Sequence, residues 1–237
     1  MQYDAQPYSR ADELLRQIPA PGGGTAYDSI LGTIERFHMP IGYWLPTSWV
    51  QGLTRAFVEQ ATGWGAGVRS RLQSTASSRS NAKAVDLRNS RWKVDIELER
   101  GNVASFYRCL IKMMAHRGYV DIDVGVIVAG TKEMASALGE NITYYERAKQ
   151  ELDACDACGV LSNLPLLLIG LKPYRSDTGV SLLYGPSSEL LHKVKALRQD
   201  YPSLNSGERE EKRKQLQVDF EKTARKDPLI RPYLRGR

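Results

Sequence analysis

The sequence predicts an α/β domain with a mixed central β-sheet that is flanked by helices. Two short apolar runs, VGVIVA at 124–129 and LLLIGL at 166–171, are typical of strands that are buried on both faces. A third segment, 91–99, alternates strictly between apolar and charged residues, as a half-buried strand does. Stretches with helical spacing lie between these segments, and strands that alternate with helices indicate an α/β fold.

The elements before residue 84 are predicted from apolar spacing and from helix- and turn-forming residues. Apolar positions at helical spacing and a possible cap at Thr47 or Ser48 predict helices, whereas small, polar, Pro and Gly residues predict loops. The predicted helices cover 11–18, 27–37 and 48–62, the strand covers 65–72, and the loops cover 40–46 and 74–83.

From residue 84 onwards the pattern predicts a β-hairpin and then alternating helices and strands. The hairpin has strands 84–88 and 91–99 with a turn at 89–90, and Gly101 ends its second strand. The elements after it are helix 103–117, strand 124–129, a helical turn at 131–139, helix 143–157, strand 166–171, and helices 187–199 and 207–225.

Size, charge and cysteine content narrow the class of protein. With 237 residues and a mass of 26.6 kDa, the chain suits a single domain over residues 1–237. The net charge is +6, and residues 208–237 carry ten basic against six acidic side chains, which favours a polyanionic partner such as nucleic acid. Three cysteines form no disulfide framework and suit the cytoplasm, and no apolar run reaches membrane-spanning length.

Strand 91–99 is acidic on one of its faces. Glu97 and Glu99 are two residues apart, so they project from the same face about 7 Å apart. The hairpin brings Asp86, which lies between apolar Val85 and Leu87, across from them. Converging carboxylates are costly without a cation, and Mg²⁺ is held by such groups together with phosphate oxygens. The apolar face is Trp92, Val94, Ile96 and Leu98, and the charged face is Lys93, Asp95, Glu97 and Glu99.

A simpler interpretation of the same alternation is a solvated face. Acidic residues along a strand usually face water, and Lys93 and Arg100 could pair with them. The pattern alone leaves both the metal site and the solvated face open.

Four segments in order resemble the BglII/BamHI group of type II restriction endonucleases, and BglII-like members most. They are VDIELERGN at 94–102, IDVGVIVAGTKEM at 122–134, NITYYERA at 141–148 and PLLLIGLKP at 165–173. The resemblance covers roughly 84–175, the expected catalytic core, and leaves 207–237 as a basic helical region. It implies a PD-(D/E)xK restriction endonuclease-like fold, a homodimer, and Mg²⁺-dependent hydrolysis of double-stranded DNA at a palindromic site.

The resemblance also implies roles for individual residues. Asp86, Glu97 and the Leu98 carbonyl would bind the metal, and Glu99 would orient or deprotonate the attacking water or bind a second ion. Most PD-(D/E)xK nucleases have lysine at the position of Glu99, whereas this group has Glu or Gln. Asp95 remains an alternative to Asp86 as the first metal ligand. Products would carry a 5′-phosphate and a 3′-hydroxyl.

Asn102 is the most specific candidate for reading DNA bases. Members of this group place a base-reading asparagine at this offset from the second acid, and an amide can pair with a base edge in the major groove. Asparagine is also a good helix cap, and one residue can do both. A GATC-containing hexamer is the expected target. The other expected DNA-binding residues are Ser105, Asn141, Thr143 and Tyr144.

Several other features have plainer expectations. His116 is expected in a surface or capping role, and Cys155 with Cys158 as two thiols near a helix end. The Met113–Met114 face of helix 103–117 is expected in the core or the dimer interface. Basic residues in 69–93 and 208–237 could grip phosphates or face solvent. A repair or antiviral nuclease of the same fold, and a non-catalytic DNA-binding module, remain alternative functions.

Overall fold

The computed structural model describes residues 3–37, 57–58, 61, 63–66, 69–70, 83–99, 101–119, 122–134, 143–172, 193, 196–197 and 199–224. These residues belong to two compact units. The first lies within residues 2–35 and 61–172 and contains the main sheet; the second lies within residues 36–60 and 173–237 and contains helix α8 (Ser206–Ala224). The single domain over 1–237 stays a prediction.

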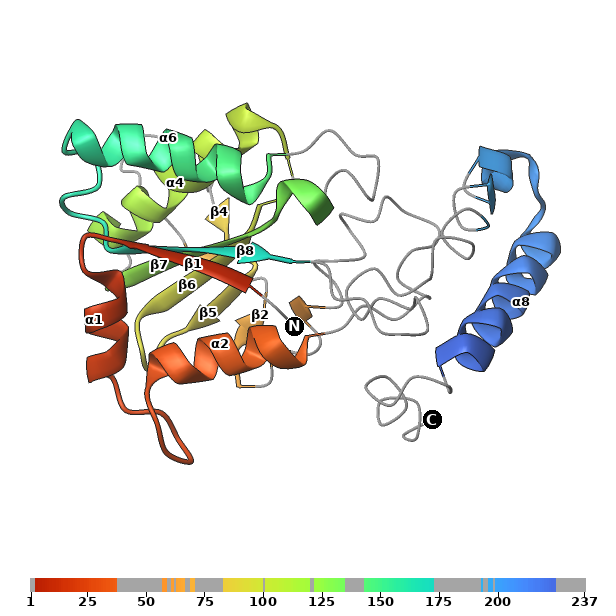
Figure 1. The fold of residues 1–237 in the computed structure, drawn as a ribbon, viewed down its shortest axis with the longest axis horizontal. Helices are drawn as coiled ribbons and strands as arrows, with labels where there is room; N and C mark the ends of the chain where they lie inside the picture. The colour runs from red at the N-terminus through yellow and green to blue at the C-terminus, as the bar shows by residue number, and fades with distance from the viewer. Residues whose placement is uncertain are drawn as a thin grey trace. The chain divides into compact units, whose positions relative to one another are not determined.

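A mixed six-stranded sheet forms the centre of the first unit, with the order β1-β8-β7-β6-β5-β2 (Figure 1). Its three middle strands are parallel, and each outer strand runs antiparallel to its neighbour. The predicted mixed sheet is therefore confirmed. The strands are β1 (Tyr3–Tyr8), β2 (Gly65–Ala66), β5 (Leu87–Asn89), β6 (Val94–Leu98), β7 (Val124–Gly130) and β8 (Leu166–Leu171).

Helices cover both faces of this sheet. Figure 1 shows α4 (Val103–Tyr119) and α6 (Tyr145–Ala157) on one side, and α1 (Ala11–Gln17) and α2 (Ala26–Arg36) on the other. Parallel strands need a crossover connection, and α4 supplies it between β6 and β7. Apolar side chains of α4 and α6 pack on Ile127 of β7 and on β8. Every residue of β6, β7 and β8 is buried as a result.

The structure corrects the prediction of strands around the hairpin. Of the strand predicted at 65–72, the structure describes 65–66, which form β2, and 69–70, which form β3 (Arg69–Ser70). Strand β3 pairs with β4 (Lys83–Ala84) in a separate two-stranded sheet. The strand predicted at 84–88 is interrupted at Asp86. The strand predicted at 91–99 begins at Val94, because the turn extends through Lys93, whose φ of 54° is left-handed.

Strand β1 was not predicted. Its sequence, YDAQPY, mixes polar residues with a proline and shows no clear alternation. Such a sequence is accepted only at a sheet edge, where one side of the backbone needs no partner. Hydrogen bonds with β8 therefore select the strand conformation here.

Most other predicted elements are confirmed to within a few residues. They include α1, α2, α4, α6, β7, β8 and α8. The segments at 40–46 and 74–82 lie outside the described residues. The helical turn predicted at 131–139 is described for 131–134, of which 132–134 are helical, and the helices predicted at 48–62 and 187–199 are described only in part.

Candidate active site

The two carboxylates of β6, and Glu99 directly after this strand, are buried and do not face water. Asp95 is 0% exposed, Glu97 7% and Glu99 5%, so the solvated face is ruled out. Helix α4 places Lys112 and His116 one turn apart, and they contact Glu97 and Asp95 respectively. Four helical residues rise about 6 Å and two strand residues about 7 Å, so the two spacings match.

Asp95 is held by two cationic or hydrogen-bonding side chains. Arg88, its partner in the register of β5 and β6, donates Nε to Oδ1 at 2.6 Å and Nη2 to Oδ2 at 2.5 Å. His116 Nδ1 lies 2.7 Å from Oδ2. Burial alone would raise the pKa of Asp95, but Arg88 and His116 hold this pKa below its ordinary value.

His116 therefore corrects an expectation from the sequence. It is fully buried at 0% exposure and belongs to the Asp95 network, where a surface or capping role was expected. Arg88 is also buried, at 8% exposure, and its guanidinium is committed to Asp95. Arg88 thus drops out of the basic residues in 69–93 that were expected to grip phosphates.

Asp86 and Glu97 come together at the end of the hairpin. Asp86 Oδ2 accepts a hydrogen bond from the backbone N–H of Leu98 at 2.9 Å, which fixes this carboxylate next to β6. Glu97 pairs with Lys112 of α4. Burial raises the pKa of Glu97 to about 7, with Lys112 opposing the rise and the charge of Asp86 adding to it.

This pKa predicts how the stability of the metal-free protein changes with pH. Folded Glu97 keeps its proton up to about pH 7, whereas the unfolded side chain loses it near 4.5. Between these two pKa values the folded state binds more protons than the unfolded state. The free energy of unfolding therefore falls as the pH rises through this range, by about 3 kcal/mol in total. Urea unfolding in EDTA at pH 4.5, 6 and 8 measures the fall, and Glu97→Gln should lack this part of it. Equal slopes in both proteins would contradict the assignment.

Glu99 points toward the start of α4. Its Oε1 accepts a hydrogen bond from Gly101 N at 2.7 Å, and the Gly101 carbonyl accepts one from Thr143 N at 2.7 Å. A Cβ on Gly101 would lie 2.3 Å from Ser105 Cβ, so only glycine permits this approach. Gly101 thereby joins the end of β6, the start of α4 and the segment before α6.

The expected DNA-binding residues gather around this junction. Asn102 is exposed and its Oδ1 accepts a hydrogen bond from Ser105 N at 3.1 Å, which confirms that it caps α4. Ser105 Oγ accepts a bond from Arg108 at 2.8 Å. The Thr143 side chain is buried and Tyr144 is half-buried. Asn141 lies outside the described residues.

The described residues do not show the expected grouping of three carboxylates around a metal position. Within them, no three His, Cys, Asp or Glu side chains are grouped closely enough to hold a metal ion. Asp86 and Glu97 form a pair, while Glu99 turns to Gly101. A pair is still compatible with Mg²⁺, which commonly takes one or two carboxylates and completes its shell with water and phosphate oxygens.

The sequence did not reveal Lys112, Arg88 or His116 as members of this site. A signal for two of them was present, because residues 112 and 116 are four apart on a helix that follows the acidic strand directly. The choice of which helix face meets the strand comes from packing of Phe106, Leu110 and Met113 into the core.

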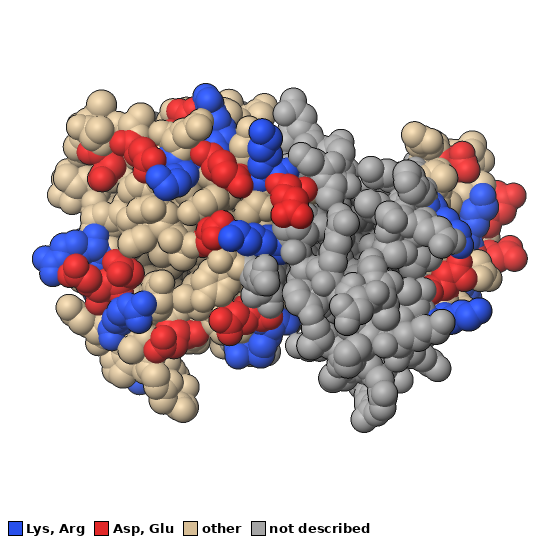
Figure 2. Space-filling model, viewed as in Figure 1, with Lys and Arg blue, Asp and Glu red and all other residues tan. Residues whose placement is uncertain are grey.

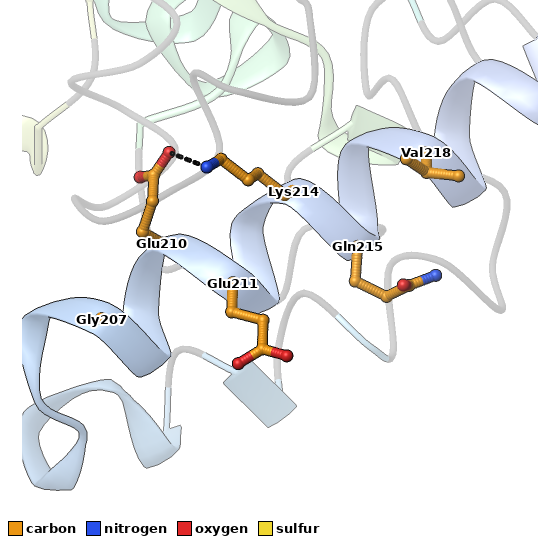
Figure 3. A pocket seen from close by; sticks show the side chains of 6 residues that line it. All are labelled: Gly207, Glu210, Glu211, Lys214, Gln215 and Val218. Carbon is orange, nitrogen blue, oxygen red and sulfur yellow. Dashed lines mark ion pairs between the residues drawn. The ribbon is translucent and has the colours of Figure 1, made fainter.

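The α8 surface is another part of the described chain where charged side chains line a hollow. The hollow along α8 is lined by Gly207, Glu210, Glu211, Lys214, Gln215 and Val218. Figure 3 shows Glu210 paired with Lys214 and Glu211 directed away from them, so no acidic pair forms there. On the viewed face of the first unit, acidic and basic side chains are intermingled (Figure 2).

Among the described residues there is no disulfide and no membrane-spanning helix. All three cysteines are free thiols, and Cys155 and Cys158 lie at the end of α6 as expected. None of the helices described combines the length and apolar character needed to cross a membrane.

Comparison with known proteins finds a matching protein family and a similar solved structure. The model of the restriction endonuclease BglII/BglIII family matches residues 5–171, which include the whole hairpin, α4 and α6. Among solved structures, the chain resembles restriction endonuclease BglII crystallised with a DNA 16-mer, with a TM-score of 0.55 and 17% sequence identity over 74% of this chain and 78% of that chain. Comparison with curated protein sequences finds no match.

Proposed function

Because the chain belongs to the restriction endonuclease BglII/BglIII family and is thus a deoxyribonuclease, we propose that it cuts double-stranded DNA at a short palindromic site with Mg²⁺ as cofactor. It would act in the cytoplasm, as a type II enzyme of a restriction-modification system, and leave a 5′-phosphate and a 3′-hydroxyl. The expected target is a hexamer with a central GATC.

The observation that supports this proposal most is the Asp86–Glu97 pair at the end of β6. Asp86, Glu97 and the Leu98 carbonyl would hold the ion. Asp95 is the weaker candidate for the first ligand, because Arg88 and His116 occupy both of its oxygens. A divalent ion here would polarise the scissile phosphate and make water a nucleophile at neutral pH.

The chain's own residues would orient the reaction. Glu99, which accepts a hydrogen bond from Gly101 N–H near the start of α4, is the residue that would orient or deprotonate the attacking water. The hydrogen bond from Leu98 N–H to Asp86 keeps this carboxylate next to the strand that carries Glu97. Direct hydrolysis needs no covalent intermediate and thus no nucleophilic side chain. Asp86, Glu97 and Glu99 therefore supply the residue types that the proposed reaction needs.

The test is cleavage of a plasmid of mixed sequence in the presence of Mg²⁺, followed by sequencing of the ends. The proposal expects discrete fragments whose ends share one palindrome and carry 5′-phosphates. Ends without a common sequence would instead favour a repair or antiviral nuclease of the same fold. Binding without cleavage would favour a non-catalytic module.

A homodimer is part of the proposal, and α4 offers a surface for it. Tyr107, Ile111 and Met114 are 36%, 56% and 40% exposed, and their spacing of four and three residues aligns them in one apolar stripe. Two copies of such a stripe can pack across a two-fold axis. Each active site would then face one of the two scissile phosphates of a palindrome.

A charge placed in this stripe should dissociate the dimer. Ile111→Lys buries an ammonium in the proposed interface, so sedimentation should show a dimer for the unchanged protein and a monomer for the variant. Val160→Lys is the matched control, because Val160 is also an exposed apolar residue, at 41%, but follows α6 in the chain and is not part of the α4 stripe. A monomer for the unchanged protein, free and DNA-bound, would refute the dimer.

Base reading by Asn102 can be separated from its role as a cap. Asn102→Asp keeps a good capping oxygen but loses the amide donor, whereas Asn102→Ala loses both. If Asn102 reads bases, both variants should lose about 1–3 kcal/mol of discrimination per contact at inner base pairs, and only Ala should lower stability. Cleavage of single-base variants of the site, with melting temperatures, measures both. If Asn102→Asp still discriminates fully against single-base variants of the site, Asn102 only caps α4.

A further inference from the structure

Lys112 is the cation that meets Glu97. Its side chain reaches Glu97 Oε1 from the third turn of α4 and is only 16% exposed. Among the described residues, no donor reaches this buried oxygen with the geometry of a hydrogen bond, so the ion pair is what compensates it. A buried carboxylate with so little other support requires a nearby positive charge.

The neighbouring groups do not take over this role. Arg88 and His116 both bind Asp95, which lies two residues before Glu97 on β6. Cys109 lies one turn before Lys112 on α4, and burial raises the pKa of its thiol well above the ordinary value, so it stays neutral. Asp86 adds negative charge close to Glu97. An ionised Glu97 at the end of β6 therefore requires a cation before any metal ion arrives.

We propose that Lys112 is a tethered counter-ion that holds Glu97 in the metal-free enzyme and gives up this carboxylate when the divalent ion binds. The inference rests on the proposed metal site. Lysine suits the exchange because its ammonium is a compact charge on a flexible stem, which can swing out to solvent. The site would remain folded without metal, and Glu97 would be in place when the ion enters.

The test compares thermal unfolding of the full-length protein without DNA, in EDTA and over a Mg²⁺ titration. Runs are made at pH 9, where protons do not replace Lys112 on Glu97. Lys112→Met keeps the length of the side chain and removes its charge. It should lower the melting temperature in EDTA by on the order of 5 °C or more, and saturating Mg²⁺ should restore most of the loss. The apparent Mg²⁺ affinity should rise about tenfold, because no ion pair has to be broken.

Two further proteins complete the comparison. Lys149→Met removes the surface ion pair with Asp153, whose Nζ–Oδ2 distance is 2.7 Å, and should leave the Mg²⁺ response unchanged. The double variant Lys112→Met/Glu97→Gln should regain stability in EDTA and lose the Mg²⁺ response. If Lys112→Met does not fold in EDTA, folding of the double variant still supports the proposal.

Three results would overturn it. An equal loss of stability with and without Mg²⁺ would make Lys112 a structural residue only, and a weaker Mg²⁺ affinity in Lys112→Met would make it a helper of metal binding. Failure of the double variant to fold would assign Lys112 to packing. In each case DNA cleavage by the unchanged protein would leave the proposed function standing, whereas absence of both cleavage and a Mg²⁺ response would remove the proposed metal site itself.

Discussion

Replacement of Glu97 by Gln is expected to lower the rate of DNA cleavage by at least about 1,000-fold, because several kcal/mol of transition-state stabilisation by the bound ion would be lost. The change is nearly isosteric. Glu97 points toward α4, while Val94, Ile96 and Leu98 belong to the opposite face, so the strand should keep its packing. Single-turnover cleavage of a plasmid containing the mapped site, with Mg²⁺ in excess, measures the rate.

The matched control for this variant is Asp123→Asn. Asp123 is another carboxylate of the first unit, but it is about half exposed, precedes β7, and pairs with Arg117 on the surface. The Asp123→Asn variant should cleave DNA at the same rate as the unchanged protein. Binding of the site in Ca²⁺, together with the melting temperature, shows whether Glu97→Gln is folded. Cleavage within tenfold of the unchanged protein would remove Glu97 from the metal site.

The largest loss of stability is expected for Asp95→Ala, at about 3–5 kcal/mol, because it leaves Arg88 and His116 buried without their partner. Urea unfolding at pH 7 measures the loss. The surface variant Asp123→Ala should lose at most about 1 kcal/mol. A loss of the same small size for Asp95→Ala would show that the buried network contributes little.

The dependence of this loss on pH provides a second check. The pKa of Asp95 is lowered by folding, so its contribution is present above the ordinary value near 3.8 and disappears as pH falls through the lower, folded value. The stability gap between the unchanged protein and Asp95→Ala should therefore narrow below about pH 4. A gap that stays constant from pH 7 to the acid limit would contradict the lowered pKa.

Local patterns predicted the buried strands and the acidic face of β6 correctly. Apolar runs such as 124–129 and 166–171 specify strands because few other structures bury every side chain of so short a segment. The alternation specified which residues share a face from Val94 onwards, but not at 91–93, which form the turn; the hairpin placed Asp86 beside Glu97. These features depend on periodicity and on contacts between neighbours in the chain.

The covering of that acidic face was decided by tertiary structure. Alternation shows that Asp95, Glu97 and Glu99 project together, but not whether water or a helix meets them. The core packing of α4 and the crossover to β7 bring Lys112 and His116 onto β6 and leave Glu99 at the turn of Gly101. The predicted triad of Asp86, Glu97 and Glu99 therefore becomes a pair, Asp86 and Glu97, with Glu99 bound to Gly101 N–H.

By itself, the sequence determined the α/β class, the buried strands and the carboxylates that lie at the end of the hairpin, because side-chain periodicity is a property of each local segment. Only the tertiary structure decided that β1 completes the sheet edge, that Asp95 is committed to Arg88 and His116, and that Lys112 reaches Glu97. These partners come from distant parts of the chain, and burial of charge obliges each of them to be satisfied at the same time.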